Sequence, residues 1–117
     1  KIKMRNTKEC YIVGYTSGKG NRGQTYGAVH IAEKIDDVLH YRGKVGTGFD
    51  DATIKEIWKA LKDVEKIKKP VVTGKLLDEK ISTWINPELI AEISYAKITP
   101  DKMFREPVFV RLRPDLS

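Results

Sequence analysis

The chain has 117 residues, of which 40% are hydrophobic and 32% charged, and its formal net charge is +6. This size and composition predict one folded domain rather than a disordered chain, and the lack of any long apolar run excludes a membrane-spanning segment. The single cysteine, Cys10, excludes an intrachain disulfide, and the excess of lysine and arginine favours an anionic partner such as nucleic acid.

The first part of the chain predicts three strands. Residues 9–16 are rich in β-branched and aromatic side chains, and a glycine-rich loop follows them over residues 17–23. Residues 26–35 predict a second strand, which the Asp36–Asp37 pair ends in a tight hairpin turn. Residues 38–45 alternate between apolar and polar side chains, as a third strand would. One face of this strand would carry Leu39, Tyr41 and Val45, and the other His40, Arg42 and Lys44.

The period of the sequence then changes. Apolar side chains at three-and-four spacing over residues 54–64 are typical of an amphipathic helix, with Asp50 and Asp51 as caps. Residues 71–83 predict an extended connection, and residues 84–87, which include a proline, predict a short turn.

Residues 89–98 and 108–113 predict the last two strands, with a turn at residues 99–102 between them. Three strands, a helix and two strands in this order are typical of the OB fold. This is a mainly β, five-stranded Greek-key barrel, here with one helix between strands 3 and 4, and it commonly binds oligonucleotides. An SH3-like barrel and another small α+β domain are the alternatives.

Several segments look like catalytic motifs but do not fit them. The loop at residues 18–23 lacks the spacing of a phosphate-binding loop and joins two strands, so it is either a solvated hairpin loop or one that follows a nucleic-acid backbone. Residues 34–37 resemble the Lys-x-Asp-Gly motif of nucleotidyltransferases but lack its glycine, which favours a surface lysine. His30 and His40 lack the sequence partners of a metal site or a catalytic triad, and we expect surface or packing roles for both.

Cations around the predicted strands suggest a nucleic-acid surface. Arg42 and Lys44 share the polar face of the third strand with His40, and Lys19 and Arg22 lie in the glycine-rich loop. Such a face is either an ordinary solvated sheet surface or a row of contacts to phosphates.

In order and spacing, several segments resemble the OB domain of ATP-dependent DNA ligases. The likeness is greatest to the ligase D type of bacterial end joining and to related archaeal ligases. It runs over nearly the whole chain and rests on residues 1–5, 11–20, 43–49, 84–89, 104–109 and 112–115. It implies that residues 1–7 are the end of a nucleotidyltransferase domain and its hinge, and that residues 8–117 are an OB-fold DNA-binding domain.

The resemblance also implies roles for single residues. Lys1 and Lys3 look like motif V of the family, whose lysines contact the α-phosphate of the nucleotide. Arg113 and Asp115 look like motif VI, which closes over ATP and orients the pyrophosphate leaving group. Cations in such places act by positioning and by neutralising charge. Arg5 would lie in the hinge and contribute to DNA binding.

The chain departs from the family at one position. Motif VI usually reads Arg-x-Asp-Lys, whereas Leu116 stands in place of the lysine. Loss of one charge-assisted contact to the leaving group would cost on the order of 2–3 kcal/mol.

The resemblance implies a monomeric intracellular enzyme, cytoplasmic and nucleoid-associated, that uses ATP and Mg²⁺ to seal nicks or broken ends in duplex DNA during repair, recombination or replication. The nucleophilic lysine would lie in an upstream domain of the same chain, so these 117 residues alone should be inactive. The alternatives are a non-enzymatic OB domain that binds single strands, with Tyr15, Tyr26 and Tyr41 as stacking surfaces, and the OB domain of an RNA ligase or capping enzyme.

Overall fold

The computed structural model describes residues 6–17, 26–46, 48, 51–68, 72–74 and 82–113. Its elements, in chain order, are β1 (Asn6–Ser17), β2 (Tyr26–Ile35), β3 (Val38–Val45), α1 (Asp51–Asp63), β4 (Lys66–Ile67), β5 (Ser82–Tyr95), β6 (Lys97–Ile98), β7 (Phe104–Arg105) and β8 (Val108–Leu112). The predicted strands, the helix and the hairpin turn at Asp36–Asp37 are confirmed, and the fold is mainly β.

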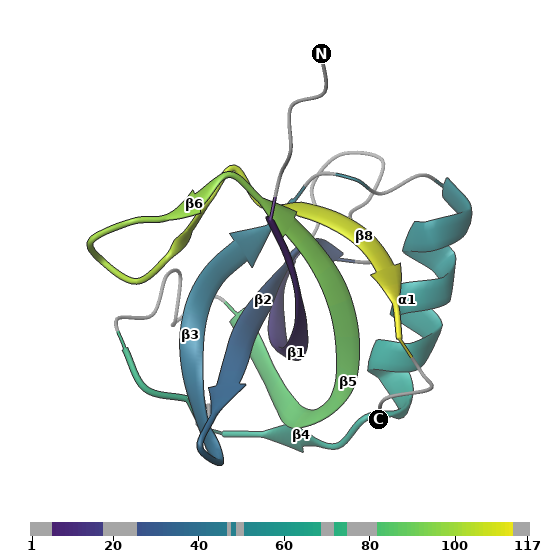
Figure 1. Ribbon diagram of the computed structural model, residues 1–117. Coiled ribbons are helices and arrows are strands. Elements are labelled where there is room, and N and C mark those ends of the chain that lie inside the picture. Colours follow the sequence, from purple (N-terminus) through teal and green to yellow (C-terminus); the bar gives the residue numbers. More distant parts are fainter. Residues whose placement is uncertain are drawn as a thin grey trace.

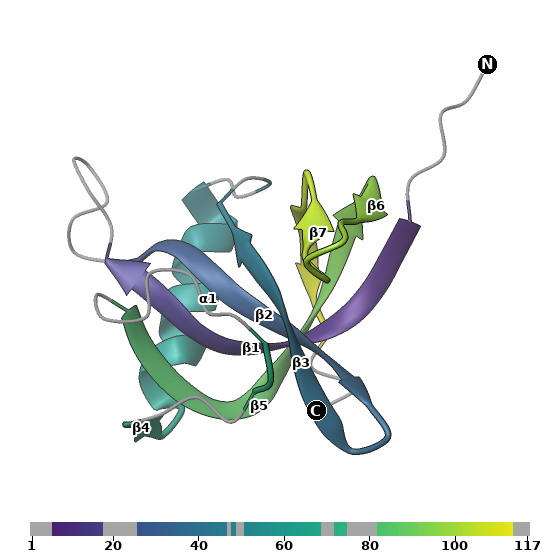
Figure 2. The ribbon, with the colours of Figure 1, turned by 90° about the vertical axis from the view of Figure 1, so that its left-hand side faces the viewer.

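One curved antiparallel sheet forms most of the domain. Its strands run in the order β3-β2-β1-β5-β4, and β8 also pairs with β5. The short strands β6 and β7 form a separate hairpin, which contains the predicted turn at residues 99–102. Figures 1 and 2 show α1 packed against one side of the curved sheet, with the β6–β7 hairpin projecting from another. Within the described residues, no helix is long and apolar enough to cross a membrane.

The core lies between the curved sheet and α1. Ile57 and Leu61, one turn apart on the helix, are both fully buried, so α1 closes the sheet with its apolar face as its sequence period predicts. Cys10 is fully buried in the same cluster, and this burial raises the pKa of its thiol to about 12. A smaller cluster around Val13, Ala32 and Trp84 packs separately from the main core.

Local irregularities in β1 and β5 explain one wrong prediction. Residues 84–87 are not a turn: β5 runs through them without interruption from Ser82. The pairing of β1 with β5 jumps from Ile12–Leu89 to Gly14–Trp84, so the stretch around Pro87 bulges away from β1. A bulge tolerates proline within a strand because no ladder hydrogen bond is required there.

A second irregularity changes the faces of β3. The pairing with β2 moves from Ala32–Tyr41 to Ile31–Gly43, which leaves Arg42 as an extra residue, and Gly43 takes a φ of 111°. The side-chain alternation is therefore interrupted at this point. Leu39 packs on the smaller cluster whereas Val45 belongs to the main core, so the prediction that one face carries both is wrong.

Candidate nucleic-acid interface and C-terminal arginine

The structure places only part of the predicted site. Arg42, Lys44 and Arg113 belong to the described residues and lie on β3 and directly after β8. The other predicted site residues lie outside the described part of the chain: Lys1, Lys3, Arg5, Lys19, Arg22 and Asp115.

Arg42 does not lie on an exposed face with His40 and Lys44, as the alternation predicted. Its side chain is 8% exposed, and its Nε donates to Glu33 Oε1 at 3.0 Å. Its Nη1 donates to the backbone carbonyl of Lys102 at 3.1 Å, which ties the β6–β7 turn to β3. The physical reason is the bulge, which interrupts the alternation at this arginine.

Glu33 joins two cations in this cluster. Lys8 Nζ lies 3.1 Å from Glu33 Oε2, whereas Arg42 contacts the other carboxylate oxygen, Oε1. Burial of the Glu33 carboxyl raises its pKa, but the hydrogen bonds from Lys8 and Arg42 lower it by more, so the pKa of Glu33 is lowered overall. The hydrogen bond to Glu33 likewise raises the pKa of Lys8. The cluster is therefore ionised near neutral pH and holds β1, β2 and β3 together with the β6–β7 turn.

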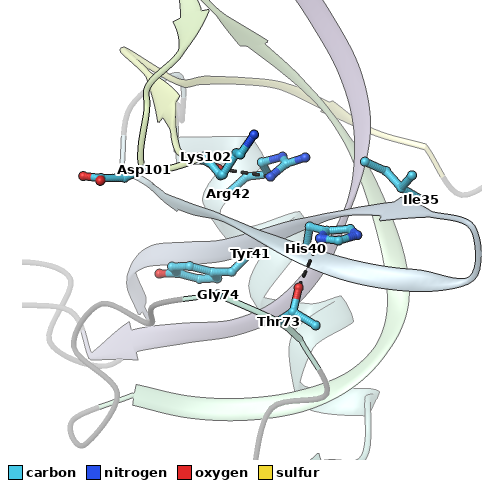
Figure 3. Close-up of a pocket in the computed structure, with 8 residues that line it drawn as sticks. All are labelled: Ile35, His40, Tyr41, Arg42, Thr73, Gly74, Asp101 and Lys102. Carbon is cyan, nitrogen blue, oxygen red and sulfur yellow. Dashed lines mark hydrogen bonds between the residues drawn. The ribbon is translucent and has the colours of Figure 1, made fainter.

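A cavity of about 380 Å³ opens beside this cluster (Figure 3). It lies between β3, the described segment 72–74 and the turn of the β6–β7 hairpin. Its lining residues are Ile35, His40, Tyr41, Arg42, Thr73, Gly74, Asp101 and Lys102. The strands β5 and β8 correspond to the fourth and fifth strands of the predicted OB fold, so this turn belongs to the connection between them. Oligonucleotides commonly bind OB folds where that connection meets strands 2 and 3.

The cavity wall combines an apolar surface with polar groups. Thr73 extends the sheet edge, since Tyr41 N donates to its carbonyl at 2.9 Å and its own N donates to the Leu39 carbonyl at 2.8 Å. Its hydroxyl lies 3.1 Å from His40 Nδ1. Figure 3 shows Arg42 beside Lys102, an exposed lysine at the rim. Imidazole, hydroxyl and ammonium groups therefore lie together around the cavity, whereas the Tyr41 ring is only 2% exposed.

His30 is a packing residue, as the sequence suggested. It is fully buried, stacks on Trp84 with ring centroids 4.5 Å apart, and lies 2.7 Å from both Tyr41 Oη and Ser82 Oγ. In the described ranges, no three His, Cys, Asp or Glu side chains come together as metal ligands.

Arg113 continues the β8 ladder and is held by acidic side chains. Its backbone N donates to the Ile90 carbonyl at 2.8 Å. Its Nη1 donates to Glu9 Oε2 at 3.2 Å and lies 3.7 Å from Glu92 Oε1, which also accepts from Arg111 Nε at 2.9 Å. We call Glu9, Glu92, Arg111 and Arg113 the arginine–glutamate cluster. No local sequence pattern identifies Glu9 and Glu92 as partners of Arg113, because their contact depends on the register of strands that are distant in the chain.

Comparison with known proteins agrees with the fold. Residues 22–116 match the family described as the ATP dependent DNA ligase C terminal region. The multifunctional non-homologous end joining protein LigD of Mycolicibacterium smegmatis is 32% identical over 116 residues, which are 98% of this chain and 15% of that protein. The chain thus spans a small part of the curated relatives that it matches.

Two solved structures are similar over nearly the whole chain. The ligase domain from M. tuberculosis LigD has a TM-score of 0.83 and 27% identity, covering 95% of this chain and 36% of that chain. A mycobacterial DNA ligase D complexed with ATP and MES has a TM-score of 0.78 and 27% identity, covering 97% of this chain and 36% of that chain. These matches confirm the predicted OB fold, although β3 and β8 do not pair to close a barrel within the described strands.

Proposed function

Because the chain belongs to the family of C-terminal regions of ATP-dependent DNA ligases, we propose that it works within a longer ligase as the OB-fold domain that completes the nucleotide site and grips DNA. The observation that carries the nucleotide role is Arg113, a cation with a fixed backbone position after the last strand, at the place of the motif VI arginine. The structure match to a ligase D complexed with ATP supports ATP as the nucleotide.

The proposed reaction transfers one adenylyl group twice and then releases it as AMP when the strand is sealed. A lysine of an upstream nucleotidyltransferase domain attacks the α-phosphate of ATP, and pyrophosphate leaves. The 5′-phosphate at the DNA break then displaces the lysine and takes the AMP. The 3′-hydroxyl attacks that phosphate, AMP leaves, and the phosphodiester bond forms. In the first transfer, Lys1, Lys3 and Arg113 neutralise phosphate charge, and Asp115 helps to orient the pyrophosphate leaving group.

The DNA role is proposed for the cavity and its surroundings. Lys102 and His40 flank the cavity, and Lys44 lies further along β3. With Lys19, Arg22 and Arg5 they would contact the phosphates of a nicked duplex. Arg42 would act indirectly, by fixing the β6–β7 turn through the Lys102 carbonyl. We propose a monomer that acts on the chromosome in the cytoplasm, with Mg²⁺ held elsewhere in the complete enzyme.

The alternative of a single-strand-binding domain finds less support. Such domains stack bases on exposed aromatic rings. Tyr15 is only 7% exposed and Tyr41 only 2% exposed, so neither offers a ring face to a base. The side chain of Tyr26 lies outside the described part of the structure.

A nick-sealing assay on the full-length protein tests the proposal. Lys3→Ala and Arg113→Ala should both lose sealing of a 5′-phosphorylated nick with ATP. Arg105→Ala is the matched control, because Arg105 is an exposed arginine on β7 that neither lines the cavity nor belongs to the arginine–glutamate cluster. Normal sealing by Arg113→Ala, or no sealing by the wild-type protein, would contradict the proposal.

A further inference from the structure

The arginine–glutamate cluster is built on an unfavourable pair. Glu9 of β1 and Glu92 of β5 are direct partners across antiparallel strands. Like charges in such positions destabilise a sheet. Here the two carboxylates are compensated by Arg111, paired with Glu92, and by Arg113, which contacts both. The four charges cancel, so the sheet is relieved of repulsion only while the arginines stay in place.

This arrangement conflicts with nucleotide binding by Arg113. A guanidinium whose charge is balanced by nearby carboxylates attracts a polyphosphate weakly, and the same carboxylates repel that polyphosphate. The side chain of Arg113 is also only 22% exposed. To contact phosphates, Arg113 must therefore exchange its carboxylate partners for them.

We propose that Glu9 and Glu92 are positioning residues that hold Arg113 in a resting place on the sheet, from which the phosphates of ATP must withdraw it. This inference rests on the proposed function. No covalent bond changes in the exchange: the Arg113–Glu9 ion pair is replaced by a guanidinium–phosphate pair, while the backbone hydrogen bond to Ile90 can stay in place.

The strength of the resting contact suits such an exchange. Glu9 is 46% exposed, so its ion pair with Arg113 is screened by water. Pairs of this exposure change an equilibrium by about two- to fivefold, whereas arginine–phosphate contacts are commonly bidentate and stronger. ATP can therefore displace the carboxylates, but at a measurable cost in apparent affinity.

The test is self-adenylation of the full-length protein as a function of ATP concentration. Glu9→Gln and Glu9→Gln/Glu92→Gln should lower the ATP concentration for half-maximal formation of lysyl-AMP by about two- to fivefold, with a smaller change in the maximal rate. Sealing of a nick that already carries AMP should be unchanged, because that step does not use ATP.

Two controls separate this role from general effects of charge or folding. Glu88→Gln removes a carboxylate from the same strand, where Glu88 is exposed and accepts a hydrogen bond from Asn86. It should leave the ATP dependence unchanged. In an Arg113→Ala background, Glu9→Gln should have no effect, because its partner is gone.

The outcomes are distinct. A higher ATP requirement in Glu9→Gln would overturn the inference, since the carboxylates would then assist binding. An unchanged requirement, an equal effect of Glu88→Gln, or an effect that persists without Arg113 would overturn it as well. In each of these cases a wild-type protein that forms lysyl-AMP leaves the proposed function standing. A wild-type protein that forms none refutes the proposed function and, with it, this inference.

Discussion

Replacing Glu33 by glutamine should destabilise the 117-residue domain by about 2 to 4 kcal/mol. The change removes the charge that balances Arg42, whose side chain is 8% exposed. Breaking a buried ion pair costs about 3–5 kcal/mol. In Glu33→Gln the Lys102 carbonyl and the amide oxygen of the introduced glutamine still accept hydrogen bonds from Arg42, so we expect a lower cost of about 2–3 kcal/mol. Lys8 is 43% exposed, so the loss of its pair adds at most about 1 kcal/mol.

The assay is urea and thermal unfolding, followed by the fluorescence of Trp58 and Trp84. A loss of 2 to 4 kcal/mol should lower the midpoint of thermal unfolding by about 8–16 °C for a domain of this size. The pH dependence gives a second signature. Because the folded state lowers the pKa of Glu33 from 4.5, its carboxylate stabilises the fold above pH 4.5. This contribution is lost as pH falls through the folded-state pKa, so the wild type and the variant should converge in acid.

Glu56→Gln is the control, because Glu56 is an exposed carboxylate on α1 with no ion pair among those found in the described part of the chain. It should change the free energy of unfolding by less than about 0.5 kcal/mol. If Glu33→Gln is equally mild, or if its effect does not shrink in acid, the role given to the Lys8–Glu33–Arg42 cluster is wrong.

Three further changes test other parts of the structure. Gly14→Ala should destabilise the domain by about 1–3 kcal/mol in urea unfolding, because the added Cβ would lie 2.6 Å from the Trp84 ring and 2.8 Å from a backbone oxygen. A variant as stable as the wild type would contradict this packing. Cys10 should react with a thiol reagent at pH 8 only after unfolding, since burial raises its pKa to about 12, and rapid labelling of the folded domain would contradict its burial. Lys102→Glu should weaken DNA binding and reduce the slope of log affinity against log salt by about 0.9 or more. Lys97→Glu, on the same hairpin but outside the cavity lining, should have less effect. Equal slopes for these two variants would contradict a place for the cavity in the DNA interface.

The sequence predicted the regular parts of the fold because they follow simple periods. The alternation in β3 and the three-and-four spacing in α1 depend on neighbouring residues, and both elements formed where expected. The prediction failed where one extra residue enters a strand. The bulge at Arg42 and the irregular stretch near Pro87 depend on pairing with strands elsewhere in the chain, so no local pattern reveals them.

The site was predicted unevenly for the same reason. The basic side chains and Arg113 can be recognised in the sequence from their residue type and motif. Their carboxylate partners cannot be recognised in this way. Glu33 beside Arg42 and Glu9 beside Arg113 follow from strand register, and the Arg113–Glu9 contact joins residues 104 positions apart. Such carboxylates decide whether a cation is available to a phosphate, and only the folded arrangement identifies them.

The proposed role of Arg113 in the nucleotide step of a DNA ligase can be measured directly. The most direct measurement is transfer of labelled AMP from ATP to the full-length protein, compared between the wild type and Arg113→Ala, with sealing of a pre-adenylated nick measured in parallel. Arg113→Ala should lower AMP transfer by at least about tenfold, while sealing of the pre-adenylated nick should be largely retained. Equal AMP transfer by the two proteins would contradict this role.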